Sequence, residues 1–121
     1  VDTTTGISYA TCSTAMELKA AAIITVTMSG FTAEMVSRYK PDCPVIGCSV
    51  NPQVCRQLNL CWGIAPLLMK KEETEEALFE EAVKVCKEAG YIKTGDRVVL
   101  TAGVPLGISG TTNMIRVIDV D

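Results

Sequence analysis

Four short runs of apolar, mainly β-branched residues constrain this chain more than any other feature, because they alternate with segments of helical periodicity. The runs cover residues 22–27, 44–50, 63–69 and 97–101, and the helical segments cover residues 6–19, 32–39, 52–59 and 73–89. A short run that is apolar throughout is typical of a strand covered on both faces of a parallel sheet. The alternation therefore predicts an α/β domain.

Residues with special backbone properties mark several boundaries of these segments. Asn51 followed by Pro52 predicts a helix start, because Asn accepts amide hydrogen bonds at a cap and Pro is tolerated at the first helical position. Pro41 stops the preceding helix because it has no amide proton. Gly90 is expected to end the longest helix as a C-cap.

The first helix is predicted over residues 6–19, with Thr5 available as its cap. Residues 1–5 are mostly polar, and we expect them to be frayed. The face that packs on the sheet is predicted from residues recurring at helical spacing, namely Ile7, Ala10, Thr14 and Leu18.

The expected sheet has five strands and lies between two layers of helices. Right-handed crossovers and short connections favour the strand order 3-2-1-4-5. The last strand, residues 114–120, alternates like an edge strand and has no helix before it, so we expect it to pair antiparallel to the fourth. The fold class is therefore a three-layer α/β domain with an open, mainly parallel, five-stranded sheet, and all 121 residues belong to one domain.

Composition and charge argue against several classes of function. The net charge is −3 and the chain has no extended basic patch, which is unlike a nucleic-acid-binding protein. No apolar run approaches the ~20 residues needed to cross a bilayer. Because no signal peptide is apparent either, we expect a cytoplasmic protein with neither nucleic acid nor membrane among its partners.

The six cysteines are expected to be reduced and buried, since they lie in apolar helix and strand patterns. The chain has no His and no Cys-x-x-Cys pair, which argues against a metal site. The missing His also argues against an enzyme with a cysteine nucleophile, because no imidazole is available as the base. The cysteines are Cys12, Cys43, Cys48, Cys55, Cys61 and Cys86.

Two conspicuous features have structural interpretations. The six glutamates between residues 72 and 81 are predicted to form a solvated face, most of them in the first half of the longest helix, where their charge complements the helix dipole. Trp62 lies in the apolar run that leads into the third strand, and we expect its ring in the core.

The predicted topology places a ligand site between two loops. In a sheet of this order the chain reverses direction between the first and fourth strands, and ligands bind at the carboxyl ends of those strands. Residues 27–32 supply hydroxyls, a Gly that permits close approach and the amides of a helix N-terminus, which together suit a phosphate. The candidate anion-binding residues are Thr27, Ser29, Gly30 and Thr32 in this loop and Gly107, Ser109, Gly110 and Thr111 in residues 103–112.

These residues have a second interpretation as ordinary turn and cap residues, of the kind that every βα junction contains. No established nucleotide-binding motif decides between the two. Gly103, Gly107 and Gly110 do not give G-x-G-x-x-G, and no Gly-Lys-Ser/Thr sequence occurs. The residue types alone therefore leave both interpretations open.

Three stretches of the chain resemble the C-terminal, effector-binding domain of pyruvate kinase. They are ISYATCSTAMELKAAAIITVTMSGFTAEMVSRYKPDCPVIG, CRQLNLCWGIAPLL and KTGDRVVLTAGVPLGISGTTNMIRV. The likeness covers nearly all 121 residues in register, which makes it more specific than a single motif. The resemblance implies the same fold as the one argued above.

The resemblance also implies a parent enzyme. That enzyme transfers phosphate from phosphoenolpyruvate to ADP in glycolysis, uses magnesium and potassium, and usually assembles as a tetramer. Its chemistry belongs to a barrel domain that this chain lacks, so we expect no catalytic residue, cofactor or metal here and no activity from the chain alone. The catalytic domain of the parent is the implied partner.

The family holds one effector phosphate in a Thr-x-Ser-Gly-x-Ser/Thr loop, which this chain matches over residues 27–32, and folds a second loop, here residues 103–112, over the ligand. Members that bind fructose 1,6-bisphosphate often carry a basic residue in the first loop, where this chain has Met28 and Phe31. The resemblance therefore favours AMP, ribose 5-phosphate, or inorganic phosphate or sulfate over the bisphosphate.

Two accounts of the role remain open. The chain is either a regulatory domain, excised or standing alone without kinase activity, or a purely structural domain for subunit assembly. In the second account the exposed strand at residues 114–120 pairs or packs across a two-fold axis to build a homo-oligomer. The accounts are not exclusive, because an effector at the crevice would adjoin the fourth strand.

Overall fold

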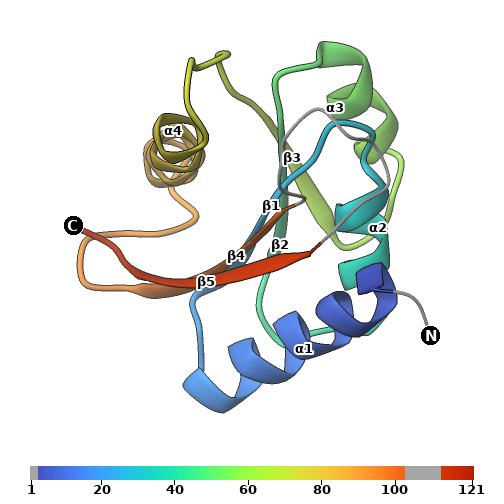
Figure 1. Ribbon diagram of the computed structural model, residues 1–121, viewed down its shortest axis with the longest axis vertical. Helices are drawn as coiled ribbons and strands as arrows, with labels where there is room; N and C mark the ends of the chain where they lie inside the picture. Colours follow the sequence, from blue (N-terminus) through green and yellow to red (C-terminus); the bar gives the residue numbers. More distant parts are fainter. Residues whose placement is uncertain (1–2, 103–112) are drawn as a thin grey trace.

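The computed structural model of the protein contains one sheet with the strand order β3-β2-β1-β4-β5 (Figure 1). It describes residues 3–102 and 113–121. The first four strands are parallel and β5 runs antiparallel to β4, so the predicted order and directions are confirmed. The strands are β1 (Ala22–Val26), β2 (Val45–Ser49), β3 (Ile64–Leu68), β4 (Arg97–Ala102) and β5 (Met114–Asp119).

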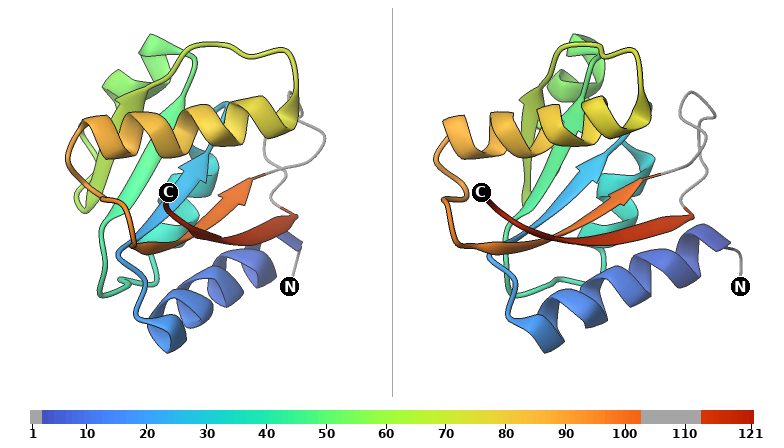
Figure 2. Two further views of the ribbon diagram at one scale, coloured as in Figure 1. Left: turned by 90° about the vertical axis from the view of Figure 1, so that its left-hand side faces the viewer. Right: turned by 60° about the vertical axis from the view of Figure 1, so that its left-hand side comes forward.

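Helices cover both faces of the sheet, which makes the three layers that the sequence predicts. Figure 2 shows α4 (Glu75–Glu88) and α1 (Thr3–Leu18) on opposite faces. The shorter helices α2 (Phe31–Ser37) and α3 (Pro52–Leu58) pack on the same face as α1. Every residue of β1 and β2 is buried, because side chains that point up and down along these central strands both meet a helical layer.

Side-chain caps fix the starts of two helices. The Asn51 Oδ1 atom accepts a hydrogen bond from the Gln53 amide at 2.9 Å, and Pro52 occupies the first turn, as predicted. The cap of α4 is Thr74, whose Oγ1 accepts from the Ala77 amide at 3.1 Å, so this helix begins two residues later than expected.

The first helix differs from its prediction in start and in buried face. It already includes Thr3, so Thr5 is a helical residue and does not cap. The predicted face, Ile7, Ala10, Thr14 and Leu18, is half-buried or exposed. Because α1 lies close to α2 and β4, small side chains fill the interface in place of large apolar ones. The buried residues are Thr4, Ser8, Thr11, Cys12 and Ala15.

The expectation that Trp62 lies in the core is wrong. Its side chain is 93% exposed and that of nearby Leu60 is 88% exposed. Both belong to the turn between α3 and β3, and the Trp62 carbonyl accepts a hydrogen bond from Ser37 Oγ on α2 at 3.5 Å. The apolar pattern signalled the approaching strand but did not show that this turn directs the ring outward.

The acidic segment is mainly a solvated face, with one exception. Glu81 is buried, and its carboxylate accepts a hydrogen bond from the Lys70 amide at 3.3 Å. Glu81 lies in the second turn of α4, on the side that faces the chain leaving β3. Its carboxylate therefore binds a backbone donor as well as contributing charge to the first half of the helix.

All six cysteines are free thiols, as predicted. Only three of them are fully buried, because water reaches part of the side chain of each of the other three. The buried thiols are Cys12, Cys48 and Cys86, and the half-buried ones are Cys43, Cys55 and Cys61. Among the residues that the structure describes, no helix is both long and apolar enough to span a membrane.

Candidate functional site

The carboxyl ends of β1 and β4 lie side by side, so the loops that follow them start from the same edge of the sheet. Val26 pairs with Ala102 across the two parallel strands. The Asn113 amide donates to the Ala102 carbonyl at 3.2 Å, which brings the start of β5 to the same place. The strand order turns between β1 and β4 here, and such a position forms the ligand crevice of open α/β sheets.

Hydrogen bonds between hydroxyls and backbone amides shape the β1–α2 loop. Buried Thr27 donates its amide to the Cys48 carbonyl at 3.0 Å, and its Oγ1 accepts from the Gly30 amide at 2.8 Å. Exposed Ser29 accepts from the Phe31 amide through Oγ at 3.3 Å. A hydroxyl oxygen that accepts one bond still carries its own O–H donor. The loop therefore holds the hydroxyl oxygens of Thr27 and Ser29 in place, and each hydroxyl can still donate a hydrogen bond.

Gly30 is required by the backbone and by its surroundings. It caps α2 with a φ of +89°, a left-handed conformation that L side chains rarely adopt. A Cβ atom at Gly30 would lie 3.1 Å from Leu58 Cδ2 on α3. Glycine lets the loop approach α3 closely. The contact with α3 in turn restricts the conformation of the loop.

The structure describes some of the other predicted residues but not those of the loop at residues 103–112. Thr32 is buried in the first turn of α2, so four predicted residues lie in one short loop and helix start. Met28 and Phe31 stand in the loop where some family members are expected to carry a basic residue, and each side chain is about two-fifths exposed. Gly107, Ser109, Gly110 and Thr111 lie outside the described residues.

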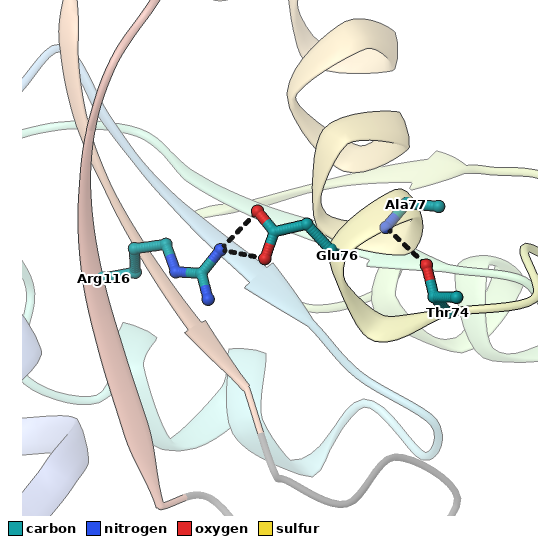
Figure 3. Close-up of polar contacts among 4 residues, drawn as sticks. All are labelled: Thr74, Glu76, Ala77 and Arg116. Carbon is teal, nitrogen blue, oxygen red and sulfur yellow. Dashed lines mark hydrogen bonds and ion pairs between the residues drawn. The ribbon is translucent and has the colours of Figure 1, made fainter.

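A second polar constellation joins α4 to β5, and the sequence analysis did not find it. Arg116 Nη1 lies 3.0 Å from both carboxylate oxygens of Glu76 (Figure 3). The guanidinium carbon of Arg116 lies 5.2 Å from the centre of the Phe79 ring. Figure 3 also shows the Thr74 cap that orients this first turn of α4. Glu76, Phe79 and Arg116 line part of a groove of about 470 Å³ between α4 and β5. A lone Arg in an apolar edge strand was the available signal.

A further ion pair ties the ends of β4 and β5 together. Arg97 Nε lies 2.8 Å from Asp119 Oδ1, and both side chains are exposed. The hydrogen bond from Arg97 and its charge lower the pKa of the Asp119 carboxyl. The pair therefore stays ionised at neutral pH and marks the register of the two strands.

The outer edge of β5 presents backbone groups that no described strand uses. The Val120 amide donates to the Asp96 carbonyl at 2.8 Å, and the Arg97 carbonyl faces β1, where it accepts from the Ala21 amide. The hydrogen-bonding direction alternates along an antiparallel pair, so the backbone amides and carbonyls of Met114, Arg116 and Ile118 point towards β4. The amides and carbonyls of the alternate residues, Ile115, Val117 and Asp119, point away from the sheet.

The family described as pyruvate kinase, alpha/beta domain, matches residues 5–118 of this chain. The chain belongs to the pyruvate kinase alpha/beta-domain family. It is 42% identical over 113 residues to a pyruvate kinase of Lactobacillus delbrueckii subsp. bulgaricus and 45% identical over 111 residues to one of Clostridium acetobutylicum. A pyruvate kinase of Sporosarcina psychrophila is 39% identical over 114 residues.

These matches cover most of this chain but a small part of each relative. They include 93%, 92% and 94% of the chain and 19%, 24% and 20% of the respective relatives. The chain therefore spans about a fifth to a quarter of the length of the curated pyruvate kinases that it matches. The resemblance inferred from the sequence is confirmed at the level of this one domain.

Proposed function

We propose that this chain is the regulatory domain of a pyruvate kinase and that it binds a phosphorylated effector at the β1–α2 and β4–β5 loops. The parent enzyme would transfer phosphate from phosphoenolpyruvate to ADP in the catalytic domain, which is the partner of this one. The observation that carries the proposal is the β1–α2 loop, where Thr27, Ser29 and left-handed Gly30 lie at the turning point of the strand order.

The chemistry of this loop suits a phosphate oxygen that is held without a cation. Hydroxyl groups donate hydrogen bonds to anions, and the glycine lets the backbone come close to the ligand. Residues 27–32 contain no Lys or Arg. A hydrogen bond to a charged partner contributes roughly 1.5–3 kcal/mol, so the lack of one basic residue weakens a bisphosphate by about tenfold to a hundredfold. We therefore propose AMP, ribose 5-phosphate, phosphate or sulfate as ligand in preference to fructose 1,6-bisphosphate.

The magnesium and potassium of the parent enzyme have no place in this proposal. Within residues 3–102 and 113–121, no three His, Cys, Asp or Glu side chains come together in a way that could hold a metal ion. The proposed effector binding rests on hydroxyl groups and backbone amides.

Calorimetric titration of the purified chain tests the ligand assignment. We expect the monophosphates to bind more tightly than fructose 1,6-bisphosphate and Ser29→Ala to weaken that binding. Ser13→Ala, which removes a hydroxyl from the middle of α1, is the matched control and should leave binding unchanged. Tighter binding of the bisphosphate, or equal effects of the two substitutions, would contradict the proposal.

The free edge of β5 supports a second role in subunit assembly. Val117 lies in the middle of this edge and is 45% exposed. If two copies pair antiparallel about Val117, Ile115 of one copy faces Asp119 of the other, and all three outward-facing residues gain backbone hydrogen bonds. We propose that the domain forms a homo-oligomer through this two-fold contact.

A proline substitution at the centre of the β5 edge can disrupt pairing between two copies without disrupting the fold of each copy. Val117→Pro removes an outward amide and leaves the hydrogen bonds between β4 and β5 in place, since the neighbouring residues make those bonds. Val117→Ala keeps the amide and is the control for the lost side chain. Sedimentation equilibrium should show a dimer for Val117→Ala and a monomer for Val117→Pro. Dimers of equal affinity would exclude this strand pairing.

A further inference from the structure

Two buried thiols from distant parts of the chain lie in contact beneath α4. Cys48 on β2 and Cys86 on α4 have their Sγ atoms 3.7 Å apart, within the sulfur hydrogen-bond range. Both side chains are fully buried, in the cluster that joins α4 to the sheet. The other cysteine hydrogen bonds of the described residues go to oxygen, as in Cys12 to the Val36 carbonyl and Cys61 to the Glu34 carboxylate. The Cys48–Cys86 contact is therefore different in kind.

The two sulfurs are in contact, but they are farther apart than the sulfurs of a disulfide. A disulfide has a sulfur–sulfur distance of about 2.05 Å, so small rotations of the two side chains would have to close the remaining gap. β2 is held between β1 and β3 by backbone pairing. The opposite partner, α4, is the helix that covers this face of the sheet (Figure 2).

We propose that Cys48 and Cys86 form a reversible disulfide that fastens α4 to β2 when the protein meets a low-molecular-weight disulfide. One cysteine attacks the small disulfide, forms a mixed disulfide and releases one small thiol. The second cysteine attacks the protein sulfur of that mixed disulfide and releases the other small thiol. The two cysteine protons end on the released thiols, so the protein loses two electrons and the oxidant gains them.

The surroundings of the pair control when this reaction occurs. The hydrogen bond with Cys86, followed by burial, raises the pKa of the Cys48 thiol well above its ordinary value. The thiolate is the attacking species, so the raised pKa makes Cys48 less reactive, and burial keeps both thiols away from an oxidant in the closed structure. Oxidation therefore proceeds through local opening of α4, and reclosing joins the two sulfurs.

Thiol counting and peptide mapping test the proposal directly. The chain is incubated with oxidised glutathione, and its thiols are titrated in denaturant. We expect the count to fall from six to four, since one disulfide consumes two, and to return to six after dithiothreitol. Mass spectrometry without reduction should find the peptides of Cys48 and Cys86 joined. Six free thiols, a lasting mixed disulfide with glutathione, or a bond between another pair would overturn the proposal.

Substitutions and unfolding measurements supply the controls. Cys86→Ala should abolish the disulfide, whereas Cys61→Ala, which removes a half-buried thiol elsewhere, should not. Closing the loop between the two positions should lower the unfolding equilibrium constant by roughly three orders of magnitude in the chain-entropy treatment. The oxidised chain should therefore unfold at higher urea than the reduced chain. A lower urea midpoint for the oxidised chain would contradict a fastening role for the bond.

Discussion

Replacement of Gly30 by alanine tests whether the candidate effector loop depends on glycine for two separate reasons. The φ of +89° imposes a left-handed backbone, which costs an L residue roughly 1–2 kcal/mol. The new Cβ would also lie 3.1 Å from Leu58 Cδ2, closer than ordinary van der Waals contact. Adding about 1 kcal/mol for this crowding gives a loss of roughly 2–3 kcal/mol in the free energy of unfolding.

Two other glycines separate the contributions. Gly90 has a φ of +86° but nothing within 4 Å of its Cβ position, so Gly90→Ala should cost only the backbone strain of roughly 1–2 kcal/mol. Gly6 lies exposed in α1 with open space around it, and Gly6→Ala should stabilise the chain by about 0.8–1.0 kcal/mol through helix propensity.

Urea unfolding of the three variants, followed by circular dichroism, provides the assay. We expect stability to fall in the order Gly6→Ala, Gly90→Ala, Gly30→Ala. In a Leu58→Ala background, the cost of Gly30→Ala should drop to that of Gly90→Ala, because the crowded atom is gone. If Gly30→Ala costs no more than Gly90→Ala in the parent chain, packing of α3 does not constrain the loop and the reasoning fails.

Two further predictions concern the start of α4 and the buried thiol of Cys12 on α1. Thr74→Ala removes the side-chain cap of α4 and should lower the unfolding free energy by about 1 kcal/mol, measured by urea unfolding; Thr74→Ser keeps the hydroxyl and should cost less. Burial, with a smaller contribution from Cys43, raises the pKa of Cys12 from 9.0 to about 11, so the folded chain keeps this proton longer than the unfolded chain does. The protonated Cys12 thiol therefore contributes fully to the free energy of unfolding below pH 9, and this contribution is lost as the pH rises towards 11. Thermal melts should show a fall in stability at alkaline pH, and this fall should be smaller in Cys12→Ala. An equal slope in that variant would contradict the assignment.

The strand pattern predicted the sheet well because the information is local. The apolar runs have to be buried on both faces, and short right-handed connections then leave few possible orders. Caps with a strong local signature, such as Asn51 followed by Pro52, were also predictable. Each of these depends on a few neighbouring residues.

Features that depend on distant partners were not predictable in the same way. The buried face of α1 is made of small polar residues such as Ser8 and Thr11, because it fits against α2 and β4. Trp62 points outward because of a turn whose geometry its apolar neighbours do not encode. The contact between Arg116 and Glu76 joins positions forty residues apart. Among the candidate site residues, the clustering of Thr27, Ser29 and Gly30 followed from the sequence, but the packing of Leu58 behind them did not.

Amide chemical shifts during titration with phosphate, AMP, ribose 5-phosphate and fructose 1,6-bisphosphate test the central claim most directly. The account predicts that one of the monophosphorylated compounds or phosphate shifts the amides of residues 27–32 and of Asn113, with little change in α4. Shifts confined to the groove between α4 and β5, or no shift at any saturating concentration, would contradict an effector site at the carboxyl ends of β1 and β4.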